Sequence, residues 1–81
     1  MTQEEIFKEL GNVFKGVKPT IDLSLIEMDT RIIDDLGLDS LAMLLTALAV
    51  ESKFHINFST SVPFATVREV VDYIEQQMNN Y

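Results

Sequence analysis

Apolar side chains recur every three or four positions near the start of the chain, which is the spacing of one face of an α-helix. This pattern predicts a helix from Gln3 to Phe14. Its apolar stripe consists of Ile6, Leu10, Val13 and Val17, with Phe7 and Phe14 alongside. Thr2 and Glu5 have the spacing of a capping box, in which each side chain accepts a backbone amide. We expect Gly16 and Pro19 to end the helix.

Two further helices follow from the same kind of pattern. The second runs from Ser40 to Phe54, a stretch without proline or glycine that is rich in Leu, Ala and Met, which are good helix formers. The last helix starts after Thr66, where the residues 66–69 again have capping-box spacing. Its apolar stripe consists of Val67, Val70, Val71, Ile74 and Met78. No alternating strand pattern competes with these helices.

Two connections join the predicted helices. Residues 17–39 carry many apolar side chains, so we expect this long connection to lie across the helices and to include a short helical turn. A short helix is expected in the second connection, residues 57–65, which Pro63 interrupts. The predicted fold is therefore all-α, a small four-helix bundle with three longer helices, a short third helix and a long ordered loop between helices one and two. We expect one domain, residues 1–81.

Composition narrows the classes of function. The 81 residues include 13 acidic and six basic side chains, which give a net charge of −7. Nucleic acid and membrane are therefore not expected as partners, and proteins with basic patches are favoured, although solubility alone also explains the acidity. No cysteine is present, so thiolate metal sites are excluded. The most apolar run, Leu41 to Val50, is too short to span a bilayer, and the acidic start lacks a secretory signal, so we expect a cytoplasmic protein.

The run from Asp34 to Leu41 brings a single serine, Ser40, through a glycine-containing turn to the start of the second helix. A nucleophilic serine needs an adjacent base, and the only histidine, His55, lies roughly 22 Å away along the same helix. No catalytic residue is therefore predicted. Ser40 and Asp39 are both favoured helix caps. Because a helix N-terminus also favours a phosphate ester, the residues alone leave capping and modification of Ser40 equally open.

The run from Asp35 to Leu41, with the letters DLGLDSL, resembles the phosphopantetheine attachment motif of acyl carrier proteins. The order of helices and the long loop resemble that family too. The resemblance implies that a phosphopantetheinyl transferase moves 4'-phosphopantetheine from coenzyme A onto Ser40, and that Asp39 helps the transferase to recognise the site. The thiol of the arm then holds an acyl group as a thioester for enzymes of fatty-acid, polyketide or related biosynthesis.

The second helix carries two opposed apolar stripes. One consists of Met43, Thr46, Ala47, Val50 and Phe54, and by the resemblance it faces the core. The other, which we call the leucine face, consists of Leu41, Leu44, Leu45 and Leu48. Either the long loop covers the leucine face, or it forms with Glu51 a docking surface for acyl-loading and acyl-using enzymes that have basic or apolar patches.

Two departures from the family pattern favour a specialised carrier. Ala42 and Leu45 stand where the family often has acidic residues, and residues 58–64 contain none either. The alternative function is an unmodified carrier-like helical subunit that binds a partner through the leucine face. We expect a monomer, and the start at Met1 with an end soon after the last helix favours a free-standing carrier over a module of a synthase.

Two further features of the sequence, the acidic residues near Ser40 and the small residues of the second helix, give only weak indications of function. Asp34, Asp35 and Asp39 lack the alternating spacing of an EF-hand, and His55 has no partner ligand in the sequence, so no metal site is expected. Thr46 and Ala47 are small for core positions and would leave room for an acyl chain. The alternative is that phenylalanines fill this space, namely Phe7, Phe14, Phe58 and Phe64.

Overall fold

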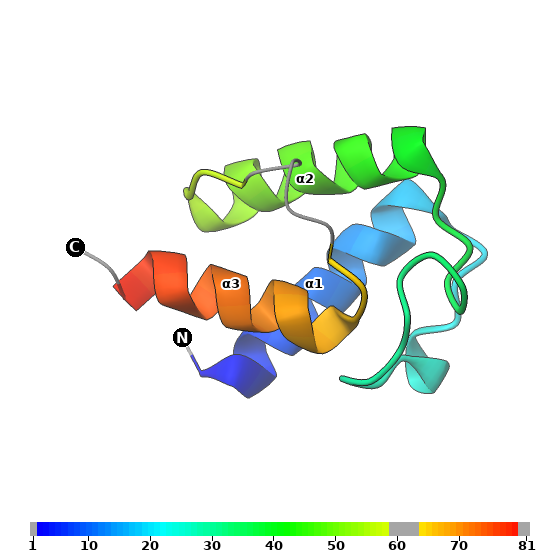
Figure 1. The fold of residues 1–81 in the computed structure, drawn as a ribbon, viewed down its shortest axis with the longest axis horizontal. Helices are drawn as coiled ribbons and strands as arrows, with labels where there is room; N and C mark the ends of the chain where they lie inside the picture. Colours follow the sequence, from blue (N-terminus) through cyan, green and yellow to red (C-terminus); the bar gives the residue numbers. More distant parts are fainter. Residues whose placement is uncertain (1, 59–63, 80–81) are drawn as a thin grey trace.

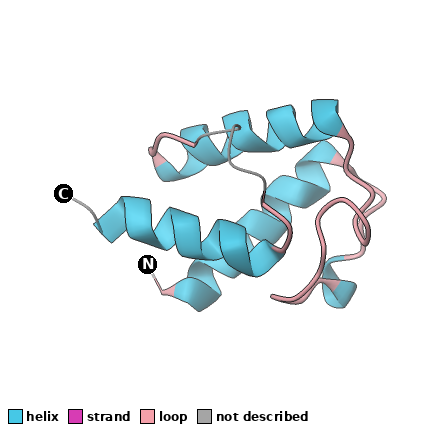
Figure 2. Cartoon of the chain, in the orientation of Figure 1, coloured by secondary structure: helices cyan, strands magenta, loops and turns pink. Residues whose placement is uncertain are grey.

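Figure 1 shows a computed structural model of the chain, which describes residues 2–58 and 64–79. Within these residues the structure consists of three α-helices and one short 3-10 turn. The elements are α1 (Gln3–Val17), η1 (Leu23–Leu25), α2 (Ser40–Phe54) and α3 (Val67–Asn79). Figure 2 shows the connecting segments as loops, and the described part contains no strand beyond the isolated bridge between Arg31 and Thr66. The predicted all-α class is confirmed for this part of the chain.

The short helix expected between residues 57 and 65 falls mainly on residues 59–63, which lie outside the described residues. The complete four-helix bundle therefore stays a prediction. The expected helical turn in the long connection occurs as η1. None of the helices in the described ranges is long and apolar enough to cross a membrane.

The start of α1 is as predicted. The hydroxyl of Thr2 accepts the amide of Glu5 at 3.2 Å, and the Glu5 carboxylate accepts the amide of Thr2 at 3.1 Å. These two bonds form the expected capping box. The hydrogen bonds that the backbone and hydroxyl of Thr2 donate also lower the pKa of Glu5 from its ordinary value.

The predicted end of α1 at Phe14 is wrong, because the helix continues to Val17. Gly16 stays helical, since a glycine inside a helix weakens it without breaking it. The last helical bond is donated by the amide of Lys18 to the carbonyl of Phe14, at 2.8 Å. Pro19 ends the helix because it disfavours helical geometry at the residue before it.

The core lies where the three helices face one another, and α1 packs against both α2 and α3. The predicted stripes of the outer helices are buried, namely Ile6, Leu10 and Val13 of α1 and Val67, Val70, Val71 and Ile74 of α3. Polar contacts reinforce both helix pairs. Glu9 on α1 accepts from Lys53 on α2 at 2.9 Å, and the Gln3 amide donates to Asp72 on α3 at 2.6 Å.

Thr46 and Ala47 lie in this core, as the resemblance implied. The Thr46 hydroxyl is satisfied because it donates to the carbonyl of Ala42 at 2.8 Å. The phenylalanines named as the alternative occupants of this space are largely buried, with Phe14, Phe58 and Phe64 in the core and Phe7 packed partly against it.

The long connection between α1 and α2 is fastened to the start of α3. The amide of Ile32 donates to Ala65, the amide of Val67 to Thr30, and the amide of Arg68 to Met28, over 3.0, 3.0 and 2.8 Å. The last two bonds satisfy amides of the first turn of α3, which have no partner inside the helix. Buried side chains anchor the connection in the core, namely Ile21, Ile26, Ile32 and Leu38.

The capping box expected at the start of α3 forms only in part. The amide of Glu69 donates to the Thr66 hydroxyl at 3.4 Å, as predicted. The Glu69 carboxylate, however, accepts the amide of Ala65 at 2.8 Å, one residue before the expected donor.

Candidate functional site

A compact turn, residues 31–38, directly precedes α2. The amide of Asp35 donates to the carbonyl of Arg31 at 2.9 Å, and the amide of Gly37 donates to the carbonyl of Ile33 at 3.0 Å. The carboxylate of Asp35 accepts the amide of Arg31 at 2.8 Å and closes the turn from the other side. These hydrogen bonds within the turn help to hold the backbone before α2.

Gly37 suits this turn because its φ of 69° lies in the left-handed region, where a side chain is strained. A Cβ at this position would also lie 2.8 Å from the Nζ atom of Lys18, which would have to move aside. The next residue, Leu38, is almost completely buried and anchors the turn in the core.

Asp39 caps α2, and this leaves the Ser40 hydroxyl free of that task. The Asp39 carboxylate accepts the amide of Ala42 at 2.8 Å, and its carbonyl accepts the amide of Met43 at 2.9 Å. Ser40 is the first residue of the helix, and it is exposed. Its hydroxyl makes no hydrogen bond with any other described residue. The structure thus resolves the choice between two caps that the sequence left open.

The surroundings of Ser40 fit a hydroxyl that another enzyme modifies. His55 lies at the opposite end of α2, where it ends the helix in a left-handed conformation with a φ of 56°. Asp34 and Asp35 pair with Arg31 at 3.5 and 3.9 Å. No three His, Asp or Glu side chains gather to hold a metal ion in residues 2–58 or 64–79. Because the first amides of a helix carry partial positive charge, this position favours a phosphate ester.

One apolar stripe of α2 is buried and the other is exposed to solvent. Thr46, Ala47, Val50 and Phe54 are buried, and Met43 packs partly against the core, as predicted. The leucine face is exposed, with 65% of Leu41, 47% of Leu44, 47% of Leu45 and 55% of Leu48 accessible. Glu51, one turn beyond Leu48, is half-buried.

The interpretation in which the long connection covers the leucine face is therefore wrong. Figure 1 shows the connection gathered beside the N-terminal end of α2, next to the start of α3. The physical reason is that its backbone amides and carbonyls between Met28 and Ile32 are committed to α3. Apolar side chains in such a row on one helix form a surface suited to a protein partner.

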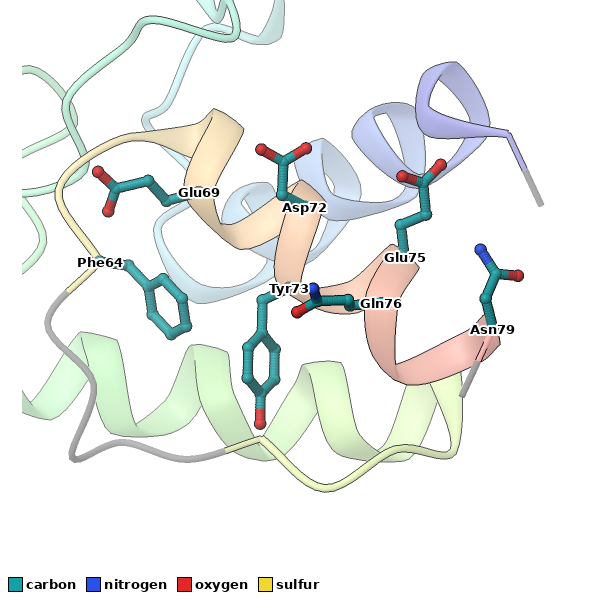
Figure 3. Close-up of a pocket in the computed structure, with 7 residues that line it drawn as sticks. All are labelled: Phe64, Glu69, Asp72, Tyr73, Glu75, Gln76 and Asn79. Atoms are coloured by element: carbon teal, nitrogen blue, oxygen red, sulfur yellow. The ribbon is translucent and has the colours of Figure 1, made fainter. Parts of the chain in front are cut away.

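No pattern in the sequence indicates the broad surface hollow along α3, which has a volume of about 1010 Å³. Figure 3 shows its lining residues, namely Phe64, Glu69, Asp72, Tyr73, Glu75, Gln76 and Asn79. Its carboxylates already serve the fold, because Asp72 and Glu75 accept from Gln3 and Glu69 accepts from Ala65. The aromatic side chains of the hollow also contribute to the fold, because the Tyr73 ring packs against the rings of Phe58 and Phe64 with centroids 5.4 Å apart.

Comparisons with known proteins indicate the family to which the chain is similar. The chain matches the family model described as the phosphopantetheine attachment site over residues 16–74. An acyl carrier protein of Coprothermobacter proteolyticus is 39% identical over 80 residues, which cover 96% of each chain. That of Onion yellows phytoplasma is 47% identical over 70 residues, or 76% of this chain and 92% of the relative. That of Thermotoga maritima is 30% identical over 79 residues, or 95% of this chain and 96% of the relative.

The cap assignment predicts different effects for two substitutions of one residue. Asp39→Ala removes the acceptor for the Ala42 amide and should lower the free energy of unfolding by about 1 kcal/mol. Asp39→Asn keeps an acceptor of similar capping strength and should stay within a few tenths of a kcal/mol of the parent. Urea unfolding followed by circular dichroism measures both, and an unchanged stability of the alanine variant would contradict the assignment.

Proposed function

The chain belongs to the acyl carrier protein family, and we propose that Ser40 is the residue that bears its phosphopantetheine arm. The protein is a carrier and not an enzyme, and its cofactor is a covalently attached 4'-phosphopantetheine. When attached, this group supplies a thiol that holds an acyl group as a thioester. The observation that supports Ser40 most strongly is its exposed hydroxyl on the first residue of α2, left free because Asp39 caps the helix.

Asp39 is proposed to have a second role, as the charge that the phosphopantetheinyl transferase recognises. Its Oδ1 atom accepts the amide of Ala42, and the residue is otherwise exposed beside Ser40. A carboxylate next to the attacking hydroxyl therefore faces solvent, where a cationic group of the transferase can pair with it. The cap and the charge are separable, because Asn keeps the first and lacks the second.

The leucine face and Glu51 are proposed as the docking surface for acyl-loading and acyl-using enzymes, with which the family generally works. Leu41 follows Ser40 directly, so a partner that holds this face also meets the arm. Most cations are already engaged within the chain, as with Lys53 to Glu9 and Arg68 to Asp29. The surplus acidic charge therefore favours partners with basic patches around an apolar centre.

The relatives bear the plain name of acyl carrier protein and favour neither a specialised carrier nor the unmodified helical subunit. Fatty-acid biosynthesis is the usual role of the family, and we propose it for this chain. We further propose a single carrier domain over residues 1–81 that acts as a cytoplasmic monomer, without nucleic acid or membrane as partner. The four-helix arrangement, with a short helix between residues 57 and 65, belongs to the same proposal.

The attachment site predicts a defined change in mass. Incubation with coenzyme A, Mg²⁺ and a broad-specificity phosphopantetheinyl transferase should add one phosphopantetheine per chain, as measured by intact mass. Ser40→Ala should gain nothing, because it lacks the attacking hydroxyl. Asp39→Asn should be modified more slowly than the parent at equal stability, because only the charge is lost. A gain of mass by Ser40→Ala, or no gain by the parent, would refute the proposed site.

The docking surface predicts that Leu45→Glu weakens the transfer of acyl groups by a partner enzyme. A carboxylate in the middle of the apolar row must be desolvated against the partner, so kcat/KM should fall on the order of tenfold or more. Asn12→Glu, which adds the same charge at an exposed position of α1, is the matched control and should not change it. Undiminished transfer by Leu45→Glu would exclude the leucine face from docking.

A further inference from the structure

We propose that Lys18 is a positioning residue for the modification of Ser40, because its ammonium group holds the turn that leads into α2. This inference rests on the proposed function of Ser40. Lys18 lies 22 positions before the serine in the sequence, and neither composition nor spacing points to it.

The backbone of Lys18 is fixed on both sides. Its amide donates to the carbonyl of Phe14 at 2.8 Å and ends α1, and its carbonyl accepts the amide of Ile21 at 3.0 Å. The side chain is partly buried, and its stem helps to line a surface hollow together with Asp35 and Leu36. The ammonium group is therefore placed by a rigid part of the fold.

That ammonium group reaches two successive carbonyls of the turn. The Nζ atom donates to the carbonyl of Leu36 at 3.1 Å and to that of Gly37 at 3.4 Å. The turn closes through the carbonyls of Arg31, Ile32 and Ile33, so its internal hydrogen bonds leave the carbonyls of Leu36 and Gly37 to Lys18. Hydrogen bonds from a charged donor are roughly twice as strong as neutral ones.

The link from this contact to the serine is short. Gly37 is held in its left-handed conformation only three residues before Ser40, and between them lie the buried Leu38 and the helix cap Asp39. A shift of the Gly37 carbonyl therefore moves the cap and the first turn of α2, unless the backbone of Leu38 changes its conformation to compensate. Lys18 thus connects the end of α1 to the start of α2 at the point where the hydroxyl is presented.

Lys15 provides a matched control for this contact. It lies in the last turn of α1, three residues before Lys18, and its Nζ atom donates to a carbonyl of the same connection, that of Ile21, at 2.7 Å. This bond is at the opposite end of the connection from Gly37. Removing either ammonium group therefore costs a lysine–carbonyl contact, but only the loss of Lys18 releases the turn before Ser40.

The test compares Lys18→Met with Lys15→Met, each of which keeps an unbranched stem and removes the charge. Steady-state kinetics of the transferase are measured with the apo-protein as the varied substrate, and rates are expressed per folded molecule from circular dichroism. We expect kcat/KM of Lys18→Met to fall on the order of tenfold, the effect of one charge-assisted hydrogen bond. The change should lie mainly in KM, because fewer molecules hold the turn in the form that binds.

Amide hydrogen exchange separates this local role from a loss of overall stability. In Lys18→Met the amides of Asp35, Gly37 and Ala42 should exchange faster, while those of Val70 and Val71 in α3 stay unchanged. In Lys15→Met the rate of modification should stay within about twofold of the parent. Lys18→Leu, which also lacks a hydrogen-bond donor, replaces the methionine variant if the latter does not fold.

A folded Lys18 variant with the parent's kcat/KM would overturn the inference, and so would an equal loss of kcat/KM in Lys15→Met. Both results leave the proposed function intact, because it fails only if the parent gains no arm or if Ser40→Ala gains one. The two failures are therefore distinguishable within one set of samples.

Discussion

The structure depends on one constraint, which is that α2 is apolar on two opposite faces and the core of so small a domain can cover only one. The buried face carries small side chains, Thr46 and Ala47, in the core, and the Thr46 hydroxyl is satisfied within its own helix. The other face, four leucines, is left in water. A helix that is apolar on all sides is normally buried, so this exposed row is the feature that most needs a functional explanation.

The long connection could shield the leucine face from water only by lying over it, and the hydrogen bonds of the connection prevent that. Its middle part is joined to the start of α3, where Thr30 and Met28 accept amides of the first helical turn. Its last part is folded into the turn before α2, with Leu38 buried in the core. The connection therefore orients Ser40, the proposed site of the arm, at one end of α2 and leaves the adjacent leucine face exposed.

Much of this arrangement could be predicted from the sequence because it follows from local patterns. The limits of α2 follow from a run without glycine or proline between Ser40 and Phe54, and the cap of α1 follows from the spacing of Thr2 and Glu5. The end of α1 was misplaced because a glycine inside a helix does not by itself stop it, whereas Pro19 does.

The remaining features depend on contacts between distant residues, which no local pattern contains. Asp39 and Ser40 are both good caps, and only the geometry shows which carboxylate or hydroxyl reaches the Ala42 amide. Whether the connection covers the leucines is decided by its bonds to α3. The contact of Lys18 with the Gly37 turn joins residues 19 positions apart, and lysine occurs so often on surfaces that its presence there carries no signal.

The central claim, that α2 buries one face and exposes its leucine face, is tested most directly by the accessibility of leucine methyl groups. In a sample with labelled leucine methyls, a neutral paramagnetic cosolute broadens the signals of exposed groups. We expect strong broadening for the leucine face and protection for Leu10 and Leu38, which are buried. Protection of the leucine face in the dilute protein would contradict the account, because it would mean that the connection or a second copy covers these side chains.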